Sequence, residues 1–445
     1  MARLTTFRYC LEPTVEQQSA LARHAGAARF AFNQCLALVK IALTHHRTDP
    51  AVMVPWSRFS LINAFNQWKR SEAAGRVFAV DATGTTTVHV TGLVWRHEVS
   101  AQVFEEAAVD LSRGLAAFTD SRAGSRRGRR IGFPRWKIKT RTTPSFRLRN
   151  KTSPAGRAGI RVGDSGVPRS LTLPVLGVIQ VREDTRRLRR LLTNGRAKIL
   201  SATVVYKAGR WLVSIAVEAA DLHPAQQHPA RPDTDIGGWV GADRGLSAFL
   251  VAATGDGTEV DRVTDHPKPL AAALRKQRRL ARAVTRKAKG SNNRWKAVAR
   301  LGRHHRHIRN IREHFLHQVS TRLVKTHDRL VLEDLNIVGM QANRHLSRAI
   351  SDAGWGELAR QIGYKQAWRG GQVYTVDRWF PSSRTCARCR TLQPMLRLAD
   401  RVFTCGCGYT ADRDLNAATN LAVRAEEDYA RAREPETRAP VINAC

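Results

Sequence analysis

The sequence predicts a multidomain α+β protein: a small β-barrel split by a helical insert, followed by a region of strands and helices that carries a cysteine ribbon. The chain has 445 residues, which at roughly 100–200 residues per domain indicates more than one domain. β-rich segments occur at the N-terminus and over 145–218, with helical periodicity between them. Strands and helices alternate again after residue 239, and four cysteines gather between 386 and 407.

The N-terminal segment predicts a strand followed by a helix. Phe7, Tyr9 and Leu11 alternate with polar residues, as in a half-buried strand. Thr14 and Gln17 then have the spacing of a capping box, and apolar residues keep helical spacing over 21–36. A second helix is predicted over 99–118, whereas 83–95 fits either a strand or a disordered loop.

The β-rich segments after the insert complete the predicted barrel. Their composition predicts strands over 145–150, 171–181 and 199–218, the last as a hairpin that turns at 207–209. The polar, proline-rich stretch 219–235 then predicts a linker.

The second half predicts strands that alternate with helices. Two basic helices are expected within 266–312, joined near 289–293. The other predicted elements are strands over 239–260, 329–337 and 372–379 and a helix over 355–370.

The charge balance predicts a polyanionic partner. Lys and Arg number 74 against 37 acidic residues, a formal net charge of +37. Phosphate backbones neutralise such an excess and release condensed counterions. A membrane surface is the rival anion, but no cluster of Lys and Arg lies beside an apolar anchor. No apolar run approaches the ~18–20 residues of a membrane span either. With 42% hydrophobic residues, the chain is not a disordered polycation.

Two basic segments, free of acidic residues over 121–163 and 266–312, are the candidate nucleic-acid contacts. The first is a basic arm over 121–141 that interleaves Phe133 and Trp136, aromatics that can stack on bases. The second is the predicted helix pair within 268–323. A solvated charged surface is the alternative for both. The candidate contacts are Arg126, Arg127, Arg129, Arg130, Trp136, Lys137, Arg275, Arg279, Arg282, Arg286 and Lys287.

The clustered cysteines predict a structural zinc ribbon. Cys386-x2-Cys389 and Cys405-x-Cys407, separated by fifteen residues, can present four thiolates to a tetrahedral Zn²⁺. Two strands are expected between the two pairs. Redox-active thiols and a decayed ribbon remain alternatives, and the compressed second pair departs from the usual two-residue spacing. An odd total of seven cysteines fits a reducing compartment better than a disulfide framework.

Three acidic residues form a candidate catalytic set. Asp243 lies within a predicted strand, Glu333 ends the apolar run 330–332, and Asp414 begins the last helix. Alone, each fits a turn residue or, for Asp412 or Asp414, a helix N-cap. Together they would hold two Mg²⁺ ions, which activate water and relieve charge on a scissile phosphodiester.

At these residues the sequence resembles the transposon-encoded OrfB/TnpB-like proteins, a family that includes the compact type V CRISPR nucleases. The stretches that carry the resemblance are GFPRWK (132–137), VGADRGL (240–246), WFPSSRTCARC (379–389) and ADRDLNAATNL (411–421). The resemblance implies a "wedge" barrel, a helical recognition insert, an RNase H-like (RuvC) nuclease domain and a zinc ribbon that binds target nucleic acid. The implied boundaries are 1–30 and 141–222 for the wedge, 31–140 for the insert, 223–235 for the linker, 236–380 and 411–445 for the nuclease domain, and 381–410 for the ribbon.

The same resemblance implies a function and its site. Asp243, Glu333 and Asp414 fall on the family's catalytic acids, Asp414 being preferred to Asp412, which stays a candidate support residue. The implied partners are a guide RNA and a double-stranded target DNA with a short protein-read flanking motif. A prokaryotic cytoplasm is the implied location, with the oligomeric state left open. The alternatives are guide-dependent DNA binding without efficient cleavage, and a DNA-strand-transfer transposase that needs no guide.

Overall fold

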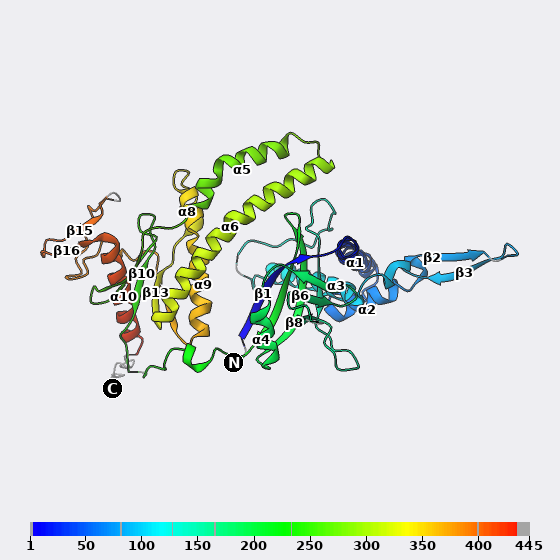
Figure 1. The fold of residues 1–445 in the computed structure, drawn as a ribbon, viewed down its shortest axis with the longest axis horizontal. Helices are drawn as coiled ribbons and strands as arrows, with labels where there is room; N and C mark the ends of the chain where they lie inside the picture. The colour runs from blue at the N-terminus through cyan, green and yellow to red at the C-terminus, as the bar shows by residue number, and fades with distance from the viewer. Residues whose placement is uncertain are drawn as a thin grey trace, which may run out of the picture. The chain divides into compact units, whose positions relative to one another are not determined.

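The chain divides into two compact units between Ala220 and Asp221. The structure is a computed structural model that describes residues 3–80, 82–126, 128–163, 166–232, 234–397 and 400–433. Figure 1 shows its helices and strands along the chain. Both units contain helices and sheets, so the chain is a multidomain α+β protein, as predicted. No helix among the described residues is both long and apolar enough to cross a membrane.

The first unit is built on a seven-stranded antiparallel sheet in the order β4-β8-β9-β1-β7-β6-β5. The N-terminal strand β1 lies between β9 and β7, so the sheet joins segments that flank the helical insert. Closure of this sheet into a barrel stays a prediction. The elements are β1 (Arg3–Glu12), β4 (Ser145–Arg149), β5 (Arg161–Val162), β6 (Ser170–Leu173), β7 (Gly177–Val181), α4 (Arg186–Thr193), β8 (Ala197–Lys207) and β9 (Arg210–Ala219).

The longest hairpin of this sheet turns where the sequence predicted it. Ala208 and Gly209 both have positive φ, 53° and 74°. Two successive residues with positive φ are typical of the tight turn that matches the twist of the flanking strands. The pairing of β8 with β9 therefore continues up to Lys207 and Arg210, and only two residues form the turn between them.

The insert contains three helices and a β-hairpin. Thr14 caps the first helix through the predicted capping box with Gln17. The segment that fitted either a strand or a loop is strand β3, which pairs antiparallel with β2. The elements are α1 (Val15–Thr48), α2 (Arg58–Trp68), β2 (Arg76–Val80), β3 (Thr86–Thr91) and α3 (Ala101–Arg122).

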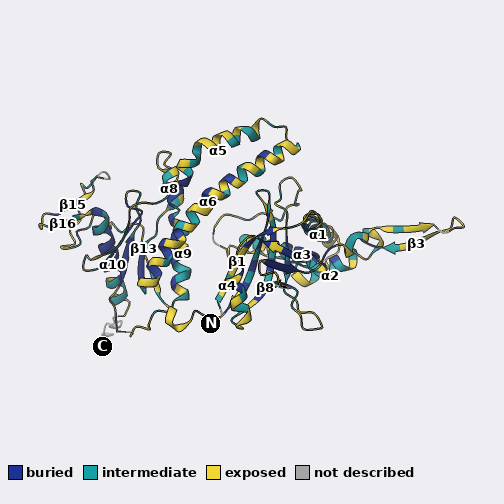
Figure 2. Ribbon diagram, viewed as in Figure 1, coloured by how far each residue is buried: buried dark blue, intermediate teal, exposed yellow. Residues whose placement is uncertain are grey.

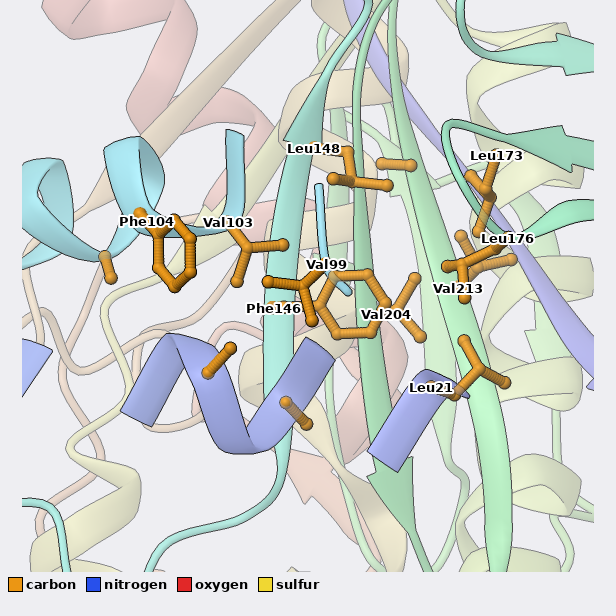
Figure 3. Close-up of a cluster of buried hydrophobic side chains, with 14 of the residues drawn as sticks. Leu21, Val99, Val103, Phe104, Phe146, Leu148, Leu173, Leu176, Val204 and Val213 are labelled. Atoms are coloured by element: carbon orange, nitrogen blue, oxygen red, sulfur yellow. The ribbon is translucent and has the colours of Figure 1, made fainter. Parts of the chain in front are cut away.

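One hydrophobic core joins the insert to the sheet. Val103 and Phe104 of α3 and Leu21 of α1 lie in the same buried cluster as Phe146 and Val204 of the sheet (Figure 3). The apolar residues at helical spacing on α1 and α3 therefore pack against β-strands. Tertiary packing of this kind supplies most of the stability of a helix in a protein.

The second unit is built on a five-stranded mixed sheet in the order β12-β11-β10-β13-β14. β10, β13 and β14 are parallel, whereas β11 is antiparallel to both β10 and β12. The strands are β10 (Val240–Asp243), β11 (Leu250–Thr254), β12 (Glu259–Val263), β13 (Arg329–Glu333) and β14 (Gln372–Val376).

Helices cover both faces of this sheet. Leu330 and Leu332 of β13 share a core with α6 (Asn292–Thr326) and α9 (Trp355–Trp368), whereas Val331 shares one with α10 (Arg413–Arg431). Figure 1 shows α10 on one side of β10 and β13, and α9 on the other. Burial on both faces explains why β13 reads as a continuous apolar run.

A basic helical pair extends from this unit. α5 (Pro269–Thr285) and α6 pack together, as the sequence predicted. Their outer surfaces are largely exposed (Figure 2). Two short helices, α7 (Ile337–Met340) and α8 (Ser347–Ala353), precede α9.

The cysteine segment differs from its prediction in where its strands lie. β15 (Val402–Thr404) and β16 (Thr410–Asp412) pair as an antiparallel hairpin. Two strands were expected between the cysteine pairs; among the described residues β15 lies there, whereas β16 follows the second pair, so the expectation was wrong for one of the two strands. The Cys405-Gly406-Cys407 stretch forms the turn of this hairpin, and its compressed spacing fits a turn between short strands.

Gly241 limits how closely α10 can approach the sheet. A Cβ on Gly241 would lie 2.0 Å from the carbonyl oxygen of Ala418 and 2.8 Å from the nitrogen of Ala422. These are backbone atoms of α10, so they cannot move aside as a flexible side chain would. The absence of a side chain at residue 241 lets α10 lie directly on β10.

We expect Gly241→Ala to destabilise the protein by about 1–3 kcal/mol, the usual range for overpacking a core. Gly363→Ala is the matched control, because a Cβ at this position in α9 meets nothing within 4 Å. It should be neutral or stabilise by up to about 1 kcal/mol through helix propensity. Urea unfolding of both variants checks the prediction, and equal midpoints would contradict it.

Candidate active site

Two of the predicted acids lie at the same edge of the five-stranded sheet. Val240 pairs with Leu330 and Gly241 with Val331 in the parallel β10–β13 ladder. Two residues further along this register, Asp243 ends β10 beside Glu333, which ends β13. Because parallel strands present their carboxyl ends at one edge, the two carboxylates come together although 90 residues separate them in sequence.

The third predicted acid comes from the first turn of α10. A Cβ on Gly245 would lie 3.9 Å from Oδ2 of Asp414, which places this carboxylate next to the chain that leaves β10. Asp412 has a different role: its Oδ1 accepts hydrogen bonds from the backbone nitrogens of Asp414 and Leu415, at 2.9 and 3.0 Å. Asp412 is therefore the N-cap, which leaves Asp414 free to face the other acids.

The electrostatics show that the other two acids act on Asp243. The pKa of Asp243 is raised from 3.8 to about 8, first by burial and then by the charges of Glu333 and Asp414. The pKa of Asp414 is also raised, mainly by burial and then by Asp412. The neighbouring carboxylates oppose ionisation of Asp243, an effect that a bound cation would relieve.

Sequence reasoning missed Arg244, a buried cation beside this cluster. Its side chain donates hydrogen bonds to the backbone carbonyls of Glu333 and Trp355 and is 6% exposed. It therefore ties the end of β13 to the start of α9. The sequence does not predict that Arg244 is buried beside the acids, because one arginine among 74 Lys and Arg residues does not stand out.

Ser382 is the second residue that sequence reasoning missed. Its hydroxyl donates to Oε1 of Glu333 at 2.5 Å. Because Ser382 is 5% exposed, this hydrogen bond fixes one side of the Glu333 carboxylate and leaves the other oxygen available. Its place in the SSRTC run, four residues before the first cysteine, is the one available signal.

The donor set suits a hard divalent cation. Mg²⁺ prefers carboxylate oxygens, keeps several waters and is bound by few protein ligands. Among the described residues, the carboxylate oxygens are not gathered within 4.8 Å of one another, as the four cysteine sulfurs are. A looser spread still fits a pair of ions ~3.5–4 Å apart, because each ion needs only part of the set.

The four predicted cysteines do converge. Cys386, Cys389, Cys405 and Cys407 have sulfurs that all lie within 4.8 Å of one another. The Sγ atoms of Cys386 and Cys407 are 3.8 Å apart, and those of Cys389 and Cys405 are 3.5 Å apart. A hydrogen bond with Thr391 lowers the pKa of Cys389 to about 6, which favours the thiolate that a metal requires. For Cys407 a backbone hydrogen bond from Tyr409 lowers the pKa, but burial and the neighbouring thiols outweigh it and raise the pKa to about 11.

Helix α10 joins the cysteine cluster to the acidic site. Buried Asn416 accepts from the nitrogen of Ala387 at 3.0 Å and donates to the carbonyl of Thr385 at 2.8 Å. Buried Asn420 donates to the carbonyls of Ser382 and Thr385, at 2.8 and 2.6 Å. The helix that begins with Asp414 therefore also anchors the first cysteine knuckle, so the two motifs lie side by side in sequence and in space.

The basic arm of the first unit is only partly free. Arg126, Arg129 and Arg130 are exposed, and Trp136 is 45% exposed. Lys137 instead packs its ammonium 3.7 Å from the centre of the Phe32 ring, and burial lowers its pKa. Arg127 lies outside the described residues.

Phe133 does not have the predicted freedom to stack on bases. Its ring lies against Trp56 and Phe118, with centroids 6.4 and 5.3 Å away. It is half-buried on the core of the first unit, so the prediction for Phe133 was wrong. Of the two aromatic residues in this arm, Phe133 packs on the core and Trp136 is exposed. The sequence pattern does not distinguish these two roles.

The predicted contacts of the second unit lie along one exposed helix. Arg275, Arg279 and Arg282 of α5 are exposed, as is Arg286 at its C-cap, whereas Lys287 is half-buried. Their spacing repeats every three to four residues, which places them along one stripe of the helix. No described contact with nucleic acid tests them, so they stay predictions.

The raised pKa of Asp243 predicts a pH-dependent stability. Between pH 3.8 and about 8 the folded protein holds a proton that the unfolded chain has lost. The free energy of unfolding therefore falls as pH rises through this window, and Asp243→Asn removes that fall. In magnesium-free buffer, thermal melts should show the variant more stable than wild type at pH 8 and similar near pH 4. A parallel pH dependence in both proteins would contradict the assignment.

Three family models match the chain. A model described as "Probable transposase" (OrfB_IS605) matches residues 214–344, and one described as "Cas12f1-like, TNB domain" matches residues 355–421. A model described as "Helix-turn-helix domain" (HTH_OrfB_IS605) matches residues 1–47. The second match covers Trp355 to Leu421 and so includes the cysteine cluster and Asp414.

Relatives match nearly the whole length. A protein of Mycobacterium tuberculosis H37Rv named "Putative RNA-guided DNA endonuclease" is 36% identical over 94% of this chain and 85% of its own length. A protein of the same designation from Escherichia coli K12 is 30% identical over 95% of this chain and 92% of its own length. A solved Cas12f1–sgRNA–target DNA complex covers 95% of this chain and 99% of its own, with 12% identity and a TM-score of 0.49. The chain belongs to the OrfB/TnpB-like family.

Proposed function

We propose that the protein is an RNA-guided DNA endonuclease with a single RuvC-like site. The guide RNA would pair with one strand of a double-stranded target, next to a short flanking motif that the protein reads. The second unit would be the RNase H-like nuclease domain and the first unit the wedge and recognition parts. Relatives that carry the endonuclease name are bacterial, so the target would be DNA in a bacterial cytoplasm.

The observation that carries this proposal is the meeting of Asp243, Glu333 and Asp414. Three separate elements, β10, β13 and α10, deliver one carboxylate each. Structural acids in a chain with net charge +37 would gain most by facing Lys or Arg. Among the described residues none of the three has an ion pair within 4 Å, and the charges of Glu333 and Asp414 oppose ionisation of Asp243, at a stability cost that a catalytic metal site explains.

The three carboxylates are the residues that would hold two Mg²⁺ ions. Bound there, the ions would activate water and stabilise charge on a phosphodiester. The protein's own groups hold the carboxylates in place: Ser382 donates to Glu333, Arg244 bonds to the carbonyl of Glu333, and Asp412 caps the helix that begins with Asp414.

The basic surfaces would hold the nucleic acids. The exposed arginines of α5 and of the arm over 121–141 offer guanidinium groups to phosphate oxygens. Binding of this kind is sequence-independent and weakens steeply with salt. The pairing of guide and target would then supply the sequence specificity.

We expect Asp243→Asn, Glu333→Gln and Asp414→Asn each to reduce DNA cleavage by about 10²–10⁴-fold, the rate equivalent of several kcal/mol of lost charge stabilisation. Asp412→Asn is the matched control, because asparagine is an equally good N-cap and the Asp412 carboxylate is already engaged as that cap. Single-turnover cleavage of a guide-matched duplex, with and without Mg²⁺, measures the effect. If the three variants bound but cut like wild type, the nuclease assignment would be lost.

The requirement for a guide separates the endonuclease from a transposase, the activity that the description of the OrfB_IS605 model names. RNA that copurifies with the protein should have a constant structured part and a variable end. Its digestion should abolish cleavage, and a matching synthetic guide should restore it. Strand transfer that survives digestion would favour the transposase, and guide-dependent binding without cutting would favour a DNA-binding role.

The cysteine cluster would hold one structural zinc ion. We expect about one zinc per chain by mass spectrometry of the purified protein, since four thiolates complete a tetrahedral site. Cys389→Ser should lose most of this zinc and lower the melting temperature. Cys10→Ala, a change outside the cluster, should keep it. Full zinc content in Cys389→Ser would refute the site.

A further inference from the structure

A cavity beside the acidic site contains Trp379, the most exposed tryptophan of the second unit. The cavity has a volume of about 600 Å³ and is lined by residues of β14, of the loop after it and of α10. Trp379 is 84% exposed. A large apolar ring left in water is unfavourable unless a partner covers it.

The loop that carries Trp379 is held at both ends by the Glu333–Asp334 pair. Before Trp379, the carbonyl of Val376 accepts from the nitrogen of Asp334 at 3.0 Å, and Nε of Arg378 donates to Asp334 at 3.0 Å. After it, Ser382 donates to Glu333 at 2.5 Å. The position of the indole is therefore coupled to the candidate catalytic carboxylate.

Hydrogen bonds within the loop fix its shape. The nitrogen of Trp379 donates to Oδ1 of Asp377 at 2.8 Å, and the nitrogen of Phe380 donates to the carbonyl of Asp377 at 3.1 Å. The nitrogen of Ser382 donates to the carbonyl of Phe380 at 2.9 Å. The backbone that carries the indole therefore loses little conformational freedom when a ligand stacks on the ring.

The charges of the cavity favour a neutral ligand. Asp334 is paired with Arg378, and Asp428 accepts from both Arg424 and the hydroxyl of Tyr374 at 2.9 and 2.8 Å. A cation would find these carboxylates already neutralised, and a phosphate would find Arg424 and Arg378 already paired with them. A flat, uncharged ring with polar edges suits the aromatic and acidic walls.

We propose that this cavity binds a nucleobase of the DNA strand being cut, with Trp379 as its stacking platform. This inference rests on the proposed function, because it places the scissile phosphate near Glu333 and the adjoining base on the indole. Base–aromatic stacking is tolerant of sequence, as a nuclease guided by RNA requires. Trp379 would act as a positioning residue that holds the single strand over the acids.

The test compares Trp379→Ala, Trp379→Phe and the control Val338→Ala in the complete protein–guide complex. Val338 is 82% exposed in the same unit, so it matches Trp379 in exposure. We expect Trp379→Ala to slow single-turnover cleavage about tenfold, within the range for one lost base–aromatic stack. Trp379→Phe should restore most of the rate, and Val338→Ala should match wild type. Equal rates for Trp379→Ala and wild type would overturn the inference.

Abasic substitutions then locate the base. One abasic site near the cut in the DNA strand should slow wild type as much as Trp379→Ala does, and it should not slow the variant further. Additive effects at every DNA position would overturn the inference. The same non-additivity at a guide position would place the base in the RNA and overturn its assignment to the cut strand.

A binding measurement separates this inference from the proposed function. 2-Aminopurine in a single-stranded DNA oligonucleotide should be quenched by wild type and by Trp379→Phe, but much less by Trp379→Ala at equal saturation. This readout needs no cleavage. Failure of wild type to cut would sink the endonuclease proposal alone, whereas quenching independent of Trp379 would sink the base-binding site alone.

Discussion

The fold of the second unit is organised around one unfavourable contact, the approach of three carboxylates. Burial, and then the like charges of Glu333 at the end of β13 and Asp414 in the first turn of α10, raise the pKa of Asp243 to about 8. Two features of the second unit keep these carboxylates close together. The parallel ladder fixes Asp243 beside Glu333, and Gly241 lets α10 lie on the sheet closely enough to deliver Asp414.

The cysteine cluster belongs to the same construction. α10 carries Asp414 at its start and, on later turns, the buried Asn416 and Asn420 that hold the chain around the first cysteine knuckle. Ser382 links the acidic site to this helix: its hydroxyl donates to Glu333, and its carbonyl accepts from Asn420. A metal held by the cysteines would therefore stiffen the segment that positions a catalytic carboxylate, which gives a structural ion a direct influence on the reactive site.

Local signals in the sequence predicted most elements, because each signal has a local cause. The capping box at Thr14, the turn at Ala208-Gly209 and the apolar run of β13 all formed as expected. The candidate acids were singled out because they stand at the ends of predicted strands and at a helix start, within motifs that resemble the family's, and the cysteines because four of seven lie within 22 residues. Arg244, Ser382 and Trp379 were missed because their roles depend on contacts across the fold. The prediction for Phe133 was wrong for the same reason, because the sequence around an aromatic residue in a basic arm does not show whether the ring packs on the core or faces solvent.

The central claim is that Asp243, Glu333 and Asp414 jointly hold divalent metal over a scissile phosphate. Anomalous diffraction from crystals of the guide-bound protein soaked in Mn²⁺ tests it most directly. The account predicts two manganese peaks about 3.5–4 Å apart, bounded by these three carboxylates. Peaks coordinated by other residues, or none between these acids at saturating Mn²⁺, would contradict it.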